Sequence, residues 1–356
     1  MIKKIFSLII LNFISCIDAT LYIYHQNSPY VEHVTRALEH NSIPFEFTSS
    51  INYNDDNLYI IFDVFALNEQ HLPHSYITYQ SRDLNHVKLS SQDIQKLSRA
   101  VAVWDYSFTN IKKYSTKVNH YYYFPPNYEF ADLIVLSCLL PIHALDSYKA
   151  ILSYSNQVDT DISSHLPALF CYALLQKPSV MVEAGVRSGE STKAFAHALV
   201  FNNSTLIGLD IDRASQQVYA PLKNATFWCM NDLEFPETYA ASTYQNLPID
   251  FIFVDTSHMY EHTLRELSKF VPLLTPNGMI AFHDSNINNT YVRLNSSSGS
   301  ARGNPRGVTY AIKDYFHLAF DEYHYNNFTF KKEGITWIII HYPFCNGLTL
   351  LKKEGL

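Results

Sequence analysis

The sequence predicts an α/β protein with a doubly wound parallel sheet in its C-terminal part and a smaller α/β domain before it. Short apolar runs typical of buried strands recur at residues 180–183, 205–212, 249–255 and 278–284, and each ends in an acidic residue. Segments with helical periodicity separate these runs, as the crossover connections of a parallel sheet require. Because the carboxyl ends of parallel strands meet at one edge, we expect a ligand site there.

The first strand leads into a glycine turn, residues 183–189 with the sequence EAGVRSG, and then into a helix expected over residues 192–200. Glycine lets the backbone approach a ligand closely, and the turn leaves the first amides of the helix unbonded. The turn has neither the Gly-x-Gly-x-x-Gly spacing of dinucleotide sites nor the Gly-Lys-Ser/Thr of a P-loop. The remaining interpretation is a site for S-adenosylmethionine (SAM). Its methionine end is assigned to Glu183, Gly185, Arg187, Ser188 and Gly189.

The polar residues after the next strands extend this site. Asp210, with Ile211 beside it, ends the second strand and is expected to accept hydrogen bonds from both ribose hydroxyls, as acids at this place do in nucleotide-binding α/β folds. Asn231 and Asp232 follow the apolar run 227–230 and are expected beside the adenine ring. Together these residues outline a complete nucleoside site along one sheet edge.

Residues 178–284 resemble a class I SAM-dependent methyltransferase, and most closely the small-molecule O-methyltransferases related to the macrolide-sugar and cephalosporin-biosynthesis enzymes. Four segments carry the resemblance: 182–191 (VEAGVRSGES), 253–261 (FVDTSHMYE), 276–278 (PNG) and 282–284 (FHD). The second matches the family's Ile-Asp-Gly-x-His-x-Tyr-Glu pattern, except that Thr256 stands where glycine is usual. The resemblance implies a Rossmann-like sheet with a final antiparallel strand pair, expected at 328–330 and 335–340, after a helix over 307–316.

The resemblance also implies a divalent metal, because several of these relatives bind one with acids at the ends of the fourth and fifth strands. Asp255 and Asp284 match those positions, while His283 stands where the relatives carry an acid. Oxygen ligands suit Mg²⁺, and one imidazole shifts the preference toward Mn²⁺ or a later metal. The alternative is that Asp255 only closes the SAM pocket and that His283 and Asp284 form a polar pair.

His258 is the candidate general base, with Asp255 beside it in the catalytic group. Methylation of a hydroxyl requires loss of its proton near the transition state, and a histidine of near-neutral pKa suits that task. A metal would lower the pKa of the hydroxyl. The resemblance implies the same role for the matching histidine of the macrolide-sugar enzymes. Most of the 16 histidines must have no such role, and His262 is expected to be a surface residue.

The composition restricts the substrate. The net charge is −7 and no run of lysine or arginine is present, which argues against a nucleic-acid substrate. The five cysteines are scattered without a Cys-x-x-Cys, so neither a zinc site nor a disulfide scaffold is indicated. We expect a small-molecule or sugar hydroxyl as acceptor. The sequence leaves the oligomeric state open, a homo-oligomer included.

Residues 1–19 have the shape of a secretory signal: a charged start, an apolar core and small residues after it. The apolar core is too short for a stable membrane span. This segment favours export or membrane association, whereas SAM chemistry favours the cytoplasm. The alternative function is therefore an exported, non-catalytic binding protein that retains a degenerate methyltransferase fold.

Residues 20–146 are predicted to form an α/β domain without a phosphate-binding turn. The segments 102–107 (AVWDYS) and 123–126 (YFPP) resemble the N-terminal half of bacterial glycosyltransferase-like proteins. A bifunctional protein whose first domain handles glycans is a third alternative. We expect Trp104, Tyr106 and the tyrosines at 121–123 to pack in a core rather than to bind sugar.

Two polar segments complete the organisation. Residues 147–161 are expected to be a linker to a methyltransferase domain over residues 162–356. Residues 286–305 lack apolar periodicity and are expected to form a loop beside the active site. Three arginines of that region would meet an anionic substrate: Arg293, Arg302 and Arg306.

Overall fold

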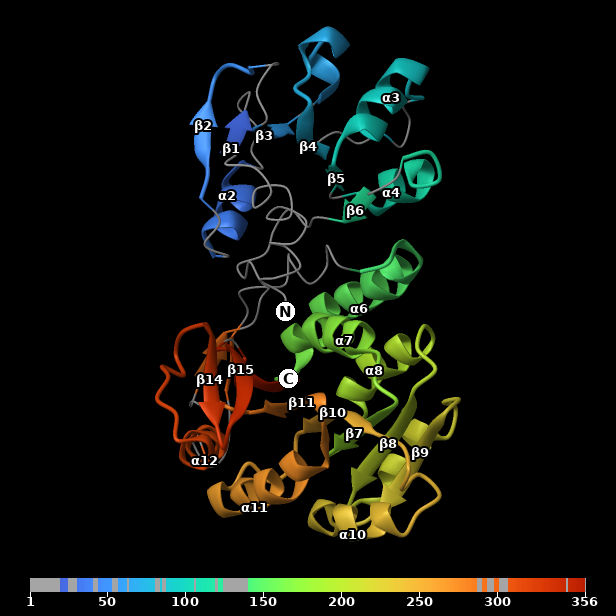
Figure 1. The fold of residues 1–356 in the computed structure, drawn as a ribbon. Helices are drawn as coiled ribbons and strands as arrows, with labels where there is room; N and C mark the ends of the chain where they lie inside the picture. Colours follow the sequence, from blue (N-terminus) through green and yellow to red (C-terminus); the bar gives the residue numbers. More distant parts are fainter. Residues whose placement is uncertain are drawn as a thin grey trace. The chain divides into compact units, whose positions relative to one another are not determined.

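The chain divides into two compact units, Met1–Leu145 and Asp146–Leu356 (Figure 1). The computed structural model describes residues 20–24, 31–40, 44–52, 57–62, 64–80, 84, 88–105, 107–118, 121–123, 140–286, 290–292, 298–300, 307–343 and 345–355. The signal-like segment 1–19 lies outside the described residues.

The N-terminal unit contains a six-stranded parallel sheet in the order β2-β1-β3-β4-β5-β6. Its strands are β1 Leu21–Tyr24, β2 Glu46–Thr48, β3 Leu58–Phe62, β4 Ser75–Gln80, β5 Ala102–Asp105 and β6 Tyr121–Tyr123. Its helices are α2 Val31–His40, α3 Ser91–Arg99 and α4 Phe108–Tyr114, with short 3₁₀ turns η1 Val64–Ala66 and η2 Glu69–His71. The α/β pattern expected for this part of the chain is confirmed.

Trp104 and Tyr121, two of the aromatic residues expected to pack in a core, are core residues of this unit. Trp104 belongs to the apolar cluster of the sheet, and Tyr121 is buried with its hydroxyl donating to Asp105, 2.7 Å away. The buried Asp105 also accepts hydrogen bonds from the Ser107 amide and from the Asn110 side chain. The hydrogen-bonding oxygens of Asp105, the last residue of β5, thus have their donors within the unit. Tyr106 and the side chains of the other two tyrosines at 121–123 lie outside the described residues.

The C-terminal unit contains an eight-stranded sheet in the order β14-β15-β16-β11-β10-β7-β8-β9. The five parallel strands are β7 Val180–Ala184, β8 Thr205–Asp210, β9 Ala225–Cys229, β10 Ile249–Val254 and β11 Leu274–His283. The three antiparallel strands are β14 Asn326–Lys332, β15 Ile335–Tyr342 and β16 Leu348–Glu354. The predicted fold class, a parallel Rossmann-like sheet that ends in antiparallel strands, is confirmed.

β16 is a strand that the sequence analysis did not place. The predicted final pair exists as β14 and β15, but β16 lies between that pair and β11. Its last three residues, Lys352 to Glu354, are charged, so the apolar pattern that predicts a buried strand is interrupted. Lys353 is nevertheless buried, because its ammonium group donates to the carbonyls of Val271 and Leu274 at 3.0 and 2.8 Å.

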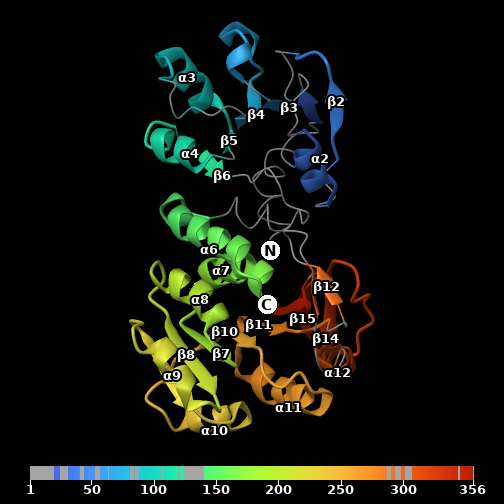
Figure 2. The same cartoon turned by 180° about the vertical axis from the view of Figure 1, so that it is seen from behind.

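Two helical layers enclose this sheet (Figure 1 and Figure 2). The helices α7 and α8 lie on one side and α10, α11 and α12 on the other. Their bounds are α7 Leu166–Gln176, α8 Glu190–Leu199, α9 Gln216–Tyr219, α10 Phe235–Ala240, α11 Tyr260–Phe270 and α12 Gly307–Phe316. Successive residues of a strand point to opposite faces of the sheet and pack against opposite helical layers. Val182 belongs to the apolar cluster on the α11 side, whereas Phe253 packs against Phe195 of α8.

Residues 147–161 form no extended linker, which corrects the expectation. Most of this segment belongs to α6, Leu145–Gln157. Its apolar residues recur at helical spacing, with Tyr148 and Ile151 fully buried, and the ring of Tyr148 packs against Phe170 of α7. The polar residues that suggested a linker lie on the other positions of the same helix.

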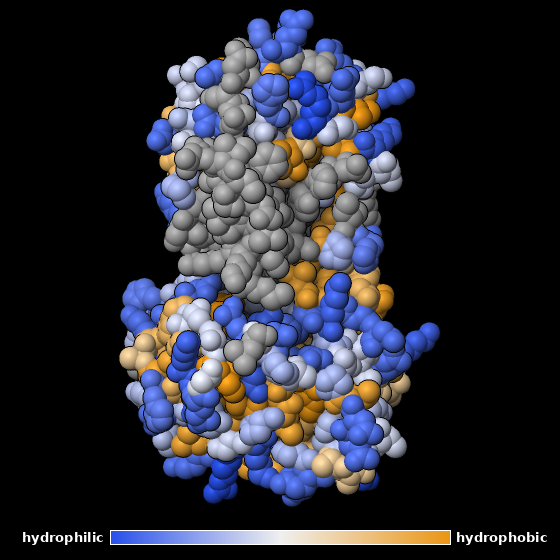
Figure 3. All heavy atoms as spheres, in the orientation of Figure 1, coloured by the Kyte–Doolittle hydropathy of each residue, from blue (hydrophilic) through white to orange (hydrophobic). Residues whose placement is uncertain are grey.

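The segment after β11 contains a short hairpin where an irregular loop was expected. β12 Thr290–Val292 pairs antiparallel with β13 Ser298–Ser300. The three arginines proposed to meet a substrate, at 293, 302 and 306, lie outside the described residues. In the view of Figure 3, hydrophilic side chains are spread over the C-terminal unit with apolar residues between them. Among the helices the structure describes, none has the length and apolar character needed to cross a membrane.

We predict that Gly185→Ala destabilises the protein more than Gly334→Ala. Both glycines have a positive φ, 88° and 78°, so alanine is strained at either position. A Cβ on Gly185 would also overlap the backbone carbonyl of Asp255, whereas one on Gly334 would meet no atom within 4 Å. Urea unfolding should give a loss of roughly 1 kcal/mol for Gly334→Ala and about 2 kcal/mol more for Gly185→Ala. Equal losses would contradict the close approach of β7 to Asp255.

Candidate active site

The register of the parallel strands brings the predicted residues to one edge of the C-terminal sheet. Ala184 at the end of β7 pairs with Leu209 of β8 and with Val254 of β10. Two backbone hydrogen bonds continue these ladders past the strand ends: the Gly185 amide donates to Leu209 and the Asp255 amide donates to Ala184, at 2.9 and 2.8 Å. The glycine turn, Asp210 and Asp255 therefore follow neighbouring strand ends, as the sequence predicted.

Asp210 holds the glycine turn in shape. Its Oδ2 accepts hydrogen bonds from the amides of Val186 and Arg187, at 3.0 and 2.8 Å, and its Oδ1 accepts from the Asp212 amide. A carboxylate oxygen accepts two hydrogen bonds, so Oδ1 retains a lone pair for a ligand hydroxyl. Arg187 has a positive φ of 49° and an exposed side chain, and Ile211 is 79% exposed beside the same turn.

Glu183 lies inside the protein rather than beside a ligand, which corrects its assignment to the methionine end of SAM. Its side chain has no exposed surface. The hydroxyls of Ser191, Thr192 and Tyr219 all donate to its carboxyl oxygens, that of Thr192 at 2.8 Å. Strand alternation turns the residue toward α8, and the first turn of that helix supplies two of the three hydroxyls. Burial raises the pKa of Glu183 to about 7.

Asp255, His258, His283 and Asp284 form one cluster at the ends of β10 and β11. Nε2 of His258 lies 3.0 Å from Oδ2 of Asp284. Nδ1 of the buried His283 lies 3.3 Å from a carboxyl oxygen of Asp255 and 3.3 Å from one of Asp284. Asp255, His258 and Asp284 each offer one ligand atom, and these atoms lie within 4.8 Å of one another. The structure thus brings the predicted metal residues together and places His258 among them.

Two residues of this cluster have an unfavourable backbone conformation. His258 and Asp284 have positive φ angles of 57° and 52°, in the left-handed region that side chains other than glycine rarely adopt. Such conformations cost about 1–3 kcal/mol each and occur often at functional sites. At both positions the side chain enters the cluster, so the observed strain accompanies the convergence of the polar groups.

Charges within the cluster shift the pKa of its members. Burial by itself lowers the pKa of His283, but the charges of Asp284 and Asp255 outweigh burial and raise it to about 10. The pKa of His258 is raised in the same way, by its hydrogen bond to Asp284 and by the charges of Asp284 and Asp255 against the effect of burial. Burial would raise the pKa of Asp284, yet the two imidazoles hold it well below its usual range. Without a metal, the imidazole of His283 is therefore a cation at neutral pH, and the pKa of His258 lies above its ordinary value.

The residues expected beside adenine are held by local hydrogen bonds. The Asn231 side chain accepts from the Leu233 amide and begins the 3₁₀ turn η6, Asp232–Glu234. The buried Asp232 accepts from His262, whose Nε2 lies 3.1 Å from each of its oxygens. His262 is therefore no ordinary surface histidine, which corrects that expectation: its side chain is 23% exposed and it also lies 3.5 Å from Glu266, one turn along α11.

Several functional neighbours escaped the sequence analysis. Tyr219 closes over Glu183 from far along the chain, and no local pattern marks it. Ser191 and Thr192 follow the glycine turn directly, and two hydroxyls after a buried acid are a signal that could have been used. The ring of the buried His165, which precedes α7, packs edge-on against His283 with centroids 5.2 Å apart.

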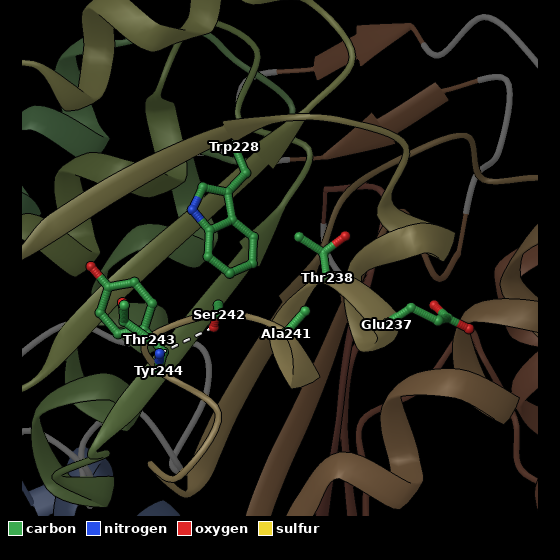
Figure 4. Close-up of a pocket in the computed structure, with 7 residues that line it drawn as sticks. All are labelled: Trp228, Glu237, Thr238, Ala241, Ser242, Thr243 and Tyr244. Atoms are coloured by element: carbon green, nitrogen blue, oxygen red, sulfur yellow. Dashed lines mark hydrogen bonds between the residues drawn. The ribbon is translucent and has the colours of Figure 1, made fainter.

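A separate hollow of about 680 Å³ lies beside β9 and α10 (Figure 4). Its lining residues are Trp228, Glu237, Thr238, Ala241, Ser242, Thr243 and Tyr244. In Figure 4 the indole of Trp228 and the ring of Tyr244 border the hollow, and the Ser242 hydroxyl accepts from the Tyr244 amide at 3.1 Å. None of these residues belongs to the site predicted from the sequence.

Residues 182–285 match a family model described as a methyltransferase domain. A comparison with curated proteins finds no match. The matched segment begins in β7 and ends just after β11, so it contains the glycine turn, Asp210 and the cluster around Asp255 and Asp284.

Solved structures give distant likenesses. The O-methyltransferase from Bacillus cereus in complex with SAH is 14% identical, with 60% of this chain and 92% of that chain covered and a TM-score of 0.37. The SAH-bound methyltransferase PaMTH1 of Podospora anserina is 14% identical over 61% and 89% of the two chains, with a TM-score of 0.35. The O-methyltransferase TomG of Streptomyces achromogenes, involved in tomaymycin synthesis and solved with SAM, is 13% identical over 59% and 90%, with a TM-score of 0.35.

We predict that Glu183 makes the folded state less stable as the pH rises. Its folded pKa of about 7 lies above its ordinary value of 4.5, so between these values the folded chain holds a proton that the unfolded chain has released. The stability from this proton is complete below the ordinary pKa and is lost as the pH rises through the folded pKa.

Urea unfolding from about pH 5 to about pH 8 measures this effect. The free energy of unfolding of the wild type should fall by up to about 3 kcal/mol relative to that of Glu183→Gln. The variant serves as the control because every other titrating group is the same. A difference that stays constant over this range would mean that the buried carboxyl is ionised throughout and would contradict the raised pKa.

Proposed function

We propose that the C-terminal unit is a class I SAM-dependent methyltransferase that methylates a hydroxyl group of a small molecule or a sugar, glycan-linked sugars included. The methyltransferase-domain match over residues 182–285 supports this proposal. The observation that carries this proposal is the cluster of Asp255, His258 and Asp284 next to the glycine turn. A methyl donor held at the turn would lie beside groups that bind and deprotonate an acceptor. When bound, SAM supplies an electrophilic methyl group.

Different residues along the sheet edge would contact different parts of SAM. The turn residues Gly185, Arg187, Ser188 and Gly189 would face the methionine end through their backbone, while Glu183 supports the turn from inside through its hydroxyl partners. Asp210 and the exposed Ile211 would contact the ribose. Asn231 and Asp232 would lie beside the adenine ring. Gly185 and Gly189 have a positive φ, which residues with side chains rarely adopt, so glycine at these positions allows the turn its shape.

The donor set of the cluster fits a divalent ion. The carboxylates of Asp255 and Asp284 and the imidazole of His258 offer ligand atoms within 4.8 Å of one another. Oδ1 of Asp284 is buried and accepts no hydrogen bond from the residues the structure describes. We propose Asp255 and Asp284 as the ligands, with His283 bridging the two carboxylates from behind at 3.3 Å. Mg²⁺ suits the oxygens, and Mn²⁺ accepts the imidazole as well. When bound, the ion would lower the pKa of an acceptor hydroxyl.

His258 would take the proton of that hydroxyl. Asp284, 3.0 Å from Nε2, orients the imidazole and stabilises its charged form once the proton has arrived. A cation on Asp255 and Asp284 would offset the negative charge that raises the pKa of His258, so the imidazole could begin the reaction neutral. The metal and the base thus depend on the same two carboxylates.

We predict that the full chain binds SAM and that Asp210→Asn weakens binding at least about tenfold, or about 1.4 kcal/mol. The loss follows because Asp210 holds two amides of the turn and is proposed to contact the ribose. The matched control is Asp212→Asn, whose exposed carboxylate only begins the 3₁₀ turn η5, Arg213–Ser215. Titration calorimetry measures both. A folded chain that binds no SAM would overturn the proposal and favour the non-catalytic exported binding protein.

We predict that His258→Gln lowers kcat for methyl transfer by roughly 10²- to 10⁴-fold and leaves the Kd for SAM unchanged, because the base acts on the acceptor. The measurement is SAH formed from SAM with a panel of hydroxylated small molecules and sugars, with Mg²⁺ or Mn²⁺ present. His324→Gln is the control, since His324 is 78% exposed and also pairs with an aspartate, Asp321. Wild-type turnover by His258→Gln would remove this residue from the mechanism.

A further inference from the structure

A second polar cluster joins α11 to the turn after β9. It consists of Asp232 in η6 and of His262 and Glu266 on consecutive turns of α11. Nε2 of His262 lies 3.1 Å from both oxygens of Asp232 and 3.5 Å from Oε1 of Glu266. The side chains are 12%, 23% and 1% exposed, in the same order. The proposed methyl-transfer chemistry uses neither His262 nor Glu266.

This cluster has more acceptors than donors. Nε2 of His262 carries at most one hydrogen, and three carboxyl oxygens surround it. The Thr256 hydroxyl donates to Oε1 of Glu266, but Oε2 of Glu266 is buried without a hydrogen-bond partner among the described residues. Two carboxylates facing one imidazolium leave a negative charge without compensation. A buried carboxylate in this state is costly unless a cation joins it.

The distances from His262 Nε2 to the two carboxylates are close to those between the ligands of a small metal ion, and the three ligand atoms all lie within 4.8 Å of one another. Ligand atoms held tetrahedrally at about 2.0–2.1 Å from an ion lie about 3.3 Å apart. The observed separations from His262 Nε2 are 3.1 and 3.5 Å. We propose that Asp232, His262 and Glu266 bind a divalent first-row transition ion of the zinc class. Two carboxylates and one imidazole supply three ligands, and the fourth position is left for water.

The choice of ion follows from the donor types. Mg²⁺ prefers oxygen ligands in octahedral geometry and retains several waters, whereas zinc accepts imidazole nitrogen with carboxylate oxygen in a compact site. Thr256 also acquires a role. It stands where the resembled family has glycine, and its hydroxyl orients Glu266 from the residue next to Asp255. An ion bound to one carboxyl oxygen of Asp232 leaves the other oxygen free to accept from the amino group of adenine, beside which Asp232 is proposed to lie.

The test uses the full chain and Zn²⁺, with the other cluster removed by Asp255→Asn and Asp284→Asn. Equilibrium dialysis should show one Zn²⁺ per chain in this double variant, and Mg²⁺ should not displace it. Adding His262→Gln or Glu266→Gln to the double variant should raise the Kd for Zn²⁺ at least about tenfold. Adding Glu261→Gln, which removes an exposed acid from the same helix, should leave binding unchanged.

The outcomes separate cleanly. No Zn²⁺ in the folded double variant, or unchanged binding after both His262→Gln and Glu266→Gln, would overturn the proposal. If Glu266→Gln does not fold, His262→Gln decides between the outcomes, because His262 is only partly buried. Zn²⁺ should raise the Tm of the double variant, and it should not do so once His262 is also replaced. The inference goes beyond the proposed function: Zn²⁺ binding is measured without SAM, so failure of either proposal leaves the other standing.

Discussion

The close approach of β7 and β10 at their carboxyl ends is the constraint on which the rest of the C-terminal unit depends. The Asp255 amide donates to the Ala184 carbonyl, and the next residue, Gly185, lies against the Asp255 backbone where a Cβ would overlap it. This contact aligns the glycine turn with the cluster around Asp284. A sheet whose two central strands ended further apart would keep its core and lose the juxtaposition of cofactor turn and polar cluster.

Four acidic residues in or just after strands of the C-terminal sheet are stabilised in four different ways. Three hydroxyls surround Glu183, and backbone amides bind Asp210. Two imidazoles offset the charge of Asp284, while Asp232 shares a single imidazole with Glu266. The hydrogen bonds of Glu183 support the fold, and those of Asp210 hold the glycine turn while one of its oxygens can still accept from a ligand. The last two arrangements contain buried carboxyl oxygens that accept no hydrogen bond from the described residues, and these are the places where we propose that cations bind.

Much of the fold was predictable because the strand and helix signals are local. The acid-terminated apolar runs are β7, β8, β10 and β11, and the helix expected over 307–316 is α12 with the same bounds. β16 was missed because its second half is charged, and its burial depends on carbonyls of residues 271 and 274 that accept from Lys353. α6 was taken for a linker because its polar residues outnumber the apolar stripe that packs against α7.

The sequence by itself determined the positions of β7, β8, β10 and β11 along the chain, the glycine turn between β7 and α8, and the acids at the strand ends. Local spacing encodes all of these, since strand and helix periods can be read from neighbouring residues. Only the tertiary structure decided which acids face a ligand. Glu183 points toward α8, where the hydroxyl of Tyr219 covers its carboxyl, and His262 is partly buried against Asp232. Such partners are distant in the chain, and a polar side chain lies inside or outside according to what packs against it.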